Sequence, residues 1–179
     1  MPVISNVRPH MKHLLDRLKS LFSNSESSEK EAACGDPLDY EKFVHLDAED
    51  LAEQGILSAY RDLAPQILQY TASALELTEE IDSDAATYAV SAAGQRFEIW
   101  EPGASNGDGW ERATVAFFEI VNLSLRSSSH KFYALYGGND LGGLFLTVEE
   151  FAAARRAITK RSDWPWVPVN EPPHYGYPN

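Results

Sequence analysis

The spacing of the apolar residues changes along this chain of 179 residues, and the change limits the possible folds. Residues 56–68 place apolar side chains three and four positions apart, which is the spacing of one helical face. Between residues 74 and 100 the period falls to two, the spacing of half-buried strands. Three such segments, at 74–78, 87–90 and 96–100, are joined by short connections. The pattern predicts an antiparallel three-stranded meander after a helical region.

Two helical pieces are expected before the meander. Asp47 is a suitable N-cap, and Glu49 and Asp50 place acids in the first turn, where they complement the helix dipole. Both Gly55 and Pro65 interrupt the apolar stripe. Because proline lacks an amide hydrogen and clashes with the preceding turn, the break is expected near Pro65.

The second half of the chain predicts a helix, a hairpin and a last helix. The helix is expected at 110–127, and the hairpin pairs 131–136 with 144–147. Thr147 and Glu150 have the spacing of a capping box, which starts the last helix. The predicted fold class is therefore α+β, with an antiparallel sheet of about five strands, the meander plus the hairpin, packed with helices.

The two ends of the chain differ from this middle part. Residues 11–22 have the apolar stripe of an amphipathic helix with a basic opposite face, and residues 23–36 are rich in serine and glutamate. We therefore expect an N-terminal amphipathic arm and flexible linker at 1–35 and a single α+β domain at 36–161. Residues 162–179, rich in proline and aromatic residues, are expected to form an extended tail.

The charge is strongly negative and unevenly spread. Fifteen Lys and Arg residues against 27 Asp and Glu residues give a net charge of -12. Residues 26–119 hold 21 acids and five bases, whereas residues 1–25 carry a net charge of +3. An acidic chain does not suit direct binding to nucleic acid, whose phosphates need lysine and arginine. With the lone Cys34, no apolar run long enough for a membrane span and no secretory leader, the sequence predicts a cytoplasmic protein.

No residues stand at the spacing of a known catalytic or metal site. The five histidines are scattered, and the paired carboxylates fall at expected caps and turns. We therefore expect no metal, no cofactor and no enzymatic activity. The alternative from the residues is an enzyme with an unrecognised site beside the glycine-rich hairpin, around Asp140 or His130.

The glycine-rich stretch from Tyr136 to Gly143 is the most unusual local sequence. It lacks the Lys-Ser/Thr pair of a P-loop, which favours a hairpin with Asn139 and Asp140 at the turn. Gly142 and Gly143 are then expected to let a backbone or an aromatic ring approach the strand closely.

Two stretches carry a resemblance to a known class of proteins. FYALYGGNDLGGLFLTVEEF (132–151) and SDWPWVP (162–168) resemble segments of small bacterial immunity proteins, which neutralise secreted interbacterial toxins. The resemblance extends over about residues 87–168. It implies an acidic, cytoplasmic and non-catalytic protein that covers the active site of a cognate toxin. A nuclease toxin is one candidate, because its basic substrate groove would attract carboxylates.

The expected partner-binding residues are acids at the first helix start, acids at the first meander turn and two aromatic anchors. They are Asp47, Glu49, Asp50, Glu79, Glu80, Asp82, Asp84, Trp164 and Trp166. The two tryptophan rings have an alternative, which is to fold back onto their own domain. An adaptor or chaperone for a secreted effector remains an alternative function, and the oligomeric state stays open.

Overall fold

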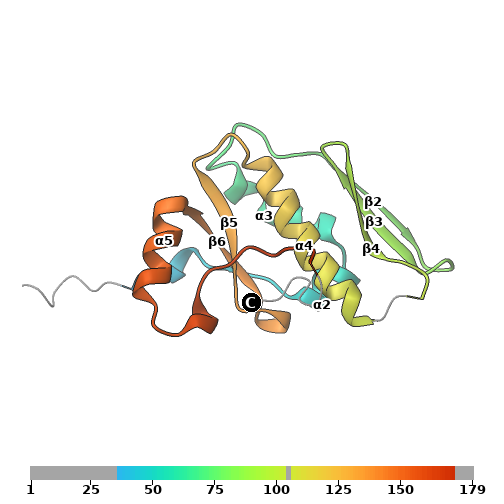
Figure 1. Ribbon diagram of the computed structural model, residues 1–179. Coiled ribbons are helices and arrows are strands. Elements are labelled where there is room, and N and C mark those ends of the chain that lie inside the picture. Colours follow the sequence, from blue (N-terminus) through green and yellow to red (C-terminus); the bar gives the residue numbers. More distant parts are fainter. Residues whose placement is uncertain (1–35, 104–105, 172–179) are drawn as a thin grey trace, which may run out of the picture. The chain divides into compact units, whose positions relative to one another are not determined.

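The computed structural model describes residues 36–103 and 106–171, and for residues 106 and 107 only the backbone (Figure 1). Within these residues the fold class is α+β, as predicted, with four α-helices and two three-stranded antiparallel sheets. The predicted N-terminal arm, and the last eight residues of the predicted tail, lie outside the described residues.

The first sheet contains the predicted hairpin. It has the order β1 (Val44–His45), β6 (Gly142–Thr147), β5 (His130–Leu135), all antiparallel. The strands β5 and β6 are almost continuously apolar because both faces of this sheet are covered. Phe132 and Phe145 pack with the helical core, whereas Tyr133 and Leu144 face a second cluster that includes the last helix.

The second sheet is the predicted meander, formed by β2 (Leu77–Asp82), β3 (Thr87–Ala92) and β4 (Gln95–Trp100). Its first strand begins later than the expected 74–78, and most of the acidic segment expected as a connection is strand. Glutamate is by itself unfavourable in a strand. In β2, however, the carboxylate of Glu79 accepts hydrogen bonds from the amide of Leu57 and the hydroxyl of Tyr88. The predicted strands thus divide between two sheets, with α4 (Asn106–Ser124) packed against both β4 and β5.

The first helical region consists of two helices, but the break lies elsewhere than predicted. α2 (Ala48–Glu53) and α3 (Ile56–Ile67) are separated at Gly55, whose φ of 103° no helix contains. Pro65 lies in the last turn of α3 without ending it. Short 3₁₀ segments occur at Tyr40–Lys42, Gly138–Asp140 and Arg161–Asp163.

The predicted helix caps are confirmed. Oδ1 of Asp47 accepts from the amides of Glu49 at 2.8 Å and Asp50 at 3.4 Å, at the start of α2. Thr147 and Glu150 form the complete capping box of α5 (Val148–Ala157). These local features depend on a few neighbouring residues, which is why the sequence predicts them.

The outer edge of β5 is closed by a side chain and by the C-terminal segment. The amide of Asn122 donates to the carbonyl of Phe132 at 2.9 Å and accepts from its N–H at 2.8 Å. Two residues on, Ala134 and Trp166 exchange backbone hydrogen bonds of 2.9 Å. The segment after α5 therefore pairs with the sheet at this point, and an unprotected strand edge is avoided.

The glycines of the hairpin serve close packing, as predicted. A Cβ at Gly142 would overlap the ring of Phe43, and a Cβ at Gly143 would overlap the ring of Phe132. The expected turn geometry is corrected, however, because the left-handed residues are Tyr136 (φ 58°) and Gly138 (φ 62°) instead of Asn139 and Asp140. Across the described part of the chain, every helix is too short or too polar to cross a membrane.

Candidate functional site

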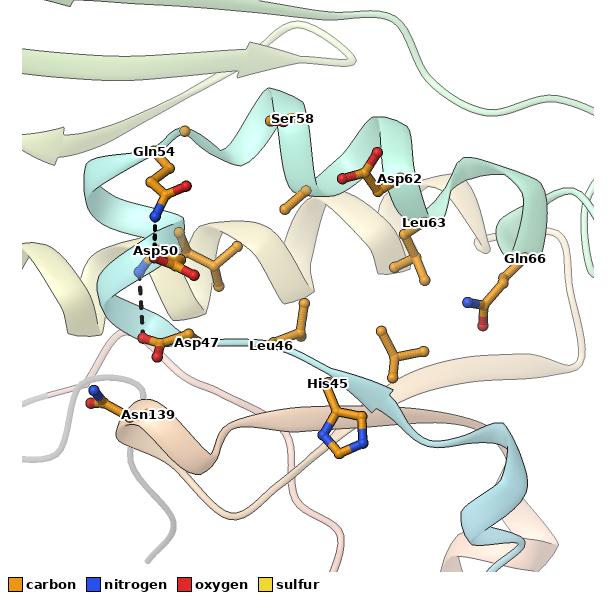
Figure 2. Close-up of a pocket in the computed structure, with 14 residues that line it drawn as sticks. His45, Leu46, Asp47, Asp50, Gln54, Ser58, Asp62, Leu63, Gln66 and Asn139 are labelled. Atoms are coloured by element: carbon orange, nitrogen blue, oxygen red, sulfur yellow. Dashed lines mark hydrogen bonds between the residues drawn. The ribbon is translucent and has the colours of Figure 1, made fainter.

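A groove of about 600 Å³ lies between α2, α3, β1 and the 3₁₀ turn of the glycine-rich hairpin (Figure 2). We call it the acidic groove. Its lining residues are Val44, His45, Leu46, Asp47, Asp50, Leu51, Gln54, Gly55, Ser58, Ala59, Asp62, Leu63, Gln66 and Asn139.

Polar side chains every four residues form one wall of the acidic groove. Asp50 lies on α2, Gln54 is the C-cap of that helix, and Ser58, Asp62 and Gln66 lie on α3. Residues four apart share one face of a helix, so this spacing gives α3 a polar stripe. Figure 2 shows Gln54, Ser58 and Asp62 following one another along the two helices.

The other lining residues make the groove amphipathic. Leu46, Leu51 and Leu63 line it, and Leu51 and Leu63 belong to the hydrophobic core. The groove therefore combines a polar wall with an apolar floor. Such a surface fits a partner segment that is itself amphipathic, since apolar contacts supply most of the energy of an interface.

The acidic groove carries negative charge without a compensating base. Asp47, Asp50 and Asp62 line it, and no lysine or arginine is among its lining residues. Oδ1 of Asp47 is occupied by the α2 cap, and Oδ1 of Asp50 accepts from the amide of Gln54 at 2.5 Å. Both carboxylates are held in place by these bonds, which suits recognition of a cationic group.

A second hollow of about 330 Å³ adjoins the acidic groove, and we call it the ring pocket. Its lining residues are Phe43, His45, Leu46, Tyr136, Asn139, Asp140 and Leu141. His45, Leu46 and Asn139 line both hollows, so one partner segment could contact both. The Phe43 ring lies edge-on to His45, with centroids 4.7 Å apart, and to Tyr136, at 6.2 Å.

Two of the nine predicted partner-binding residues meet in the acidic groove. They are Asp47 and Asp50, whereas Glu49, which lies between them in the sequence, does not line the groove. The other lining residues, among them His45, Asp62 and Gln66, were not predicted from the sequence. The polar residues Ser58, Asp62 and Gln66 were the available signal, because their spacing of four positions marks one face of a helix.

The predicted acids of the meander have other surroundings. Oε1 of Glu79 accepts from the hydroxyl of Tyr88 and, at 3.0 Å, from the amide of Leu57. Burial, together with this bond to Glu79, raises the pKa of the Tyr88 hydroxyl far above its ordinary value. Glu80 forms an exposed ion pair with Arg96 at 2.7 Å.

The last two predicted acids lie at the end of β2, which is Asp82, and in the turn that follows it, which holds Asp84. Oδ1 of Asp82 accepts from the amides of Asp84 at 3.0 Å and Ala85 at 2.9 Å, and Asp84 is exposed. None of the predicted meander acids lines the acidic groove. The predicted acids thus fall into separate groups instead of one surface.

The two predicted tryptophan anchors fold back onto their own domain. Nε1 of Trp164 donates to the carbonyl of Ile158 at 2.7 Å, and the guanidinium of Arg155 lies 4.7 Å from its ring centroid. Nε1 of Trp166 donates to the carbonyl of Tyr136 at 3.0 Å. Both rings are half-buried, as the alternative interpretation of the tail requires.

The residues of the alternative catalytic site lie at opposite ends of β5. Asp140 lines the ring pocket, whereas His130 starts β5 and packs against Tyr70, with ring centroids 4.6 Å apart. Among the described residues, no group of three or more His, Cys, Asp or Glu side chains is placed to hold a metal ion.

Comparison of the chain with protein-family models, with curated proteins and with solved structures gives no match.

Proposed function

We propose that this chain is a non-catalytic binding protein of the immunity type. It binds a basic surface segment of a cognate secreted toxin in the acidic groove and thereby covers the active site of that toxin. The observation that carries the proposal is the groove itself, which is lined by three carboxylates and by no lysine or arginine.

The charge of the groove supports fast and selective association. Carboxylates facing a basic partner speed the diffusional encounter and exclude acidic competitors. Because exposed ion pairs contribute about 0–1 kcal/mol each, charge alone does not hold such a complex. The apolar floor supplies area for burial at its partly buried residues, Val44, Leu46 and Ala59.

The dimensions of the groove fit a short segment. The 12 residues of α3 span about 18 Å at 1.5 Å per residue. At about 3.3 Å per residue, this length accommodates about five residues of extended chain. A nuclease is the favoured toxin class, because it needs basic residues around its own substrate and those residues complement Asp47, Asp50 and Asp62. The resemblance of the hairpin and tail to immunity proteins agrees with this choice.

The test is co-expression with the protein encoded next to this chain in its source genome. Cells that carry both should survive and yield a complex, and the double variant Asp50→Asn/Asp62→Asn should weaken the complex at least tenfold. A matched control is Asp82→Asn/Asp84→Asn, which removes the same charge outside the groove.

The outcomes separate the candidate functions. If both double variants weakened the complex equally, the groove would not be the binding site, because the change in net charge would explain the effect by itself. A complex that forms without protecting the cells would contradict the immunity function and favour the adaptor. Toxicity relieved in the absence of any complex would contradict a binding mechanism.

A further inference from the structure

We propose that the ring pocket is a receptor for one arginine side chain of the partner. The inference rests on the proposed function for the identity of the partner. It adds which side chain of that partner the ring pocket binds. It assigns a role to the glycine-rich hairpin and to the aromatic cluster beside it.

The walls of the pocket suit a flat cation. Phe43, His45 and Tyr136 bring three rings to one hollow, with Phe43 at the centre of the cluster. Its volume of about 330 Å³ admits a side chain but not a folded segment. A guanidinium over an aromatic face gains about 0.5–1 kcal/mol at an exposed site and more when desolvated.

The same pocket supplies a carboxylate and an amide. Asp140 and Asn139 line it from the 3₁₀ turn, and both side chains are exposed. A carboxylate can accept two parallel N–H bonds from a guanidinium, which adds direction to the attraction. No lysine or arginine is among the pocket's lining residues.

The hairpin holds the rings in position before any partner arrives. Tyr136 keeps a left-handed backbone (φ 58°), and its carbonyl accepts from Nε1 of Trp166. The ring of Phe43 lies against Gly142, where no other residue would leave it room. Fixed rings lose little conformational freedom on binding, so more of the contact energy appears as affinity.

Arginine fits this pocket better than lysine does. Its planar group stacks on rings and pairs with a carboxylate at two points, and it is less strongly hydrated than an ammonium group. Because His45, Leu46 and Asn139 also line the acidic groove, an arginine here can belong to the segment that occupies the groove.

The experiment uses the full chain and small probes, so it does not need the toxin. N-acetyl-arginine amide, N-acetyl-lysine amide and the neutral N-acetyl-citrulline amide are titrated into isotope-labelled protein, followed by NMR. We expect saturable shifts at Phe43, His45 and Tyr136 for the arginine probe and binding about threefold weaker for the lysine probe. The citrulline probe should give no saturable shift.

Two variants test the pocket, and one serves as a control. Asp140→Asn removes the charge at an exposed position, and Tyr136→Asn removes a ring while asparagine tolerates the left-handed backbone. Each should weaken the arginine probe at least threefold. Asp84→Asn, an exposed carboxylate on another turn, should leave it unchanged within twofold. If Tyr136→Asn does not fold, Asp140→Asn alone decides.

Three results would overturn the inference: no saturable shift, equal binding of citrulline and arginine, or shifts centred on Asp50 and Asp62. The proposed function is tested separately, because Asp50→Asn/Asp62→Asn should weaken the toxin complex and change the arginine probe by less than twofold. A toxin that binds the groove while the probe fails would leave the function standing and remove the arginine receptor.

Discussion

The hydroxyl of Tyr88 donates to the carboxylate of Glu79 directly at the first turn of α3. The same Glu79 oxygen accepts from the amide of Leu57 at 3.0 Å, and the Tyr88 oxygen accepts from the amide of Ile56 at 2.7 Å. Helix N-termini leave their first amides without partners, and Gly55 has no side chain to cap them. The meander therefore caps α3, and Glu79 has a structural role at this cap.

The first prediction follows from this cap. Glu79→Ala should lower the free energy of unfolding by about 1–3 kcal/mol, because the amide of Leu57 and the hydroxyl of Tyr88 lose their acceptor. Glu79→Gln keeps an acceptor and should cost less. Urea unfolding at neutral pH measures both values.

The control for this prediction is the neighbouring acid. Glu80→Gln removes one exposed ion pair with Arg96 and should change stability by less than about 0.5 kcal/mol. Equal losses at the two positions would contradict the structural role of Glu79.

The sequence predicted features that depend on near neighbours. The caps of Asp47 and Thr147 and the close packing at Gly143 each involve a preference for a few residue types, polar ones at an N-cap and glycine where a ring lies close to the backbone. The break between α2 and α3 was placed wrongly because Gly55 and Pro65 are both helix breakers, and local preference does not rank them. In α3, tertiary packing tolerates the proline within the last turn.

Features set by distant residues could not be predicted in this way. The division into two sheets depends on α4 packing against both β4 and β5. The acidic groove joins α2 and α3 to the hairpin at Asn139, which is 77 positions from Asp62 by sequence number. A pattern on one helix can mark its polar face, but the element opposite that face is known only from the tertiary structure.

The second prediction compares two adjacent glycines. Gly143→Ala should cost more stability than Gly142→Ala, with a loss of about 1–3 kcal/mol for the former. The reason is that Phe132, opposite Gly143, is fully buried and stacks on Phe118, with centroids 4.8 Å apart. The Phe43 ring opposite Gly142 is only partly buried, so a Cβ there disturbs fewer packed neighbours. Thermal unfolding of both variants tests the order, and the reverse order would contradict it.

The third prediction concerns pH and the start of α5. The amide of Thr147 donates to Oε2 of Glu150 at 2.8 Å and lowers the pKa of this carboxyl. A folded-state pKa below the unfolded value stabilises the protein above the unfolded pKa, and this contribution is lost as the pH falls through the folded pKa. Glu150→Gln should therefore be less stable than the wild type at pH 7.

The difference between Glu150→Gln and the wild type should shrink below about pH 4, where glutamate becomes protonated. Urea unfolding of both proteins between pH 3 and 7 measures it. A difference that stays constant across this range would show that the charge of Glu150 does not act through the cap. Thr147→Ala, which removes the hydroxyl of the same cap, should cost about 1 kcal/mol at pH 7.

The fourth prediction separates the two groups of predicted acids by association kinetics. Asp50→Asn/Asp62→Asn should slow association with the toxin and flatten its dependence on salt, because charges that face a basic partner steer the encounter. Asp82→Asn/Asp84→Asn removes the same charge at the β2–β3 turn and should change the rate by less than twofold. Measurement of the on-rate at two ionic strengths gives both results.

The dissociation rates complete this fourth test. Exposed charges act mainly on association, whereas buried contacts act mainly on dissociation. Leu46→Ala, in the floor of the acidic groove, should therefore speed dissociation and leave the salt dependence of the on-rate unchanged. If the turn variant slows association as much as the groove variant does, long-range charge governs the encounter and the groove has no special part in it. If only Leu46→Ala has an effect, the partner binds through apolar contacts, and the basic surface expected of the toxin is not needed.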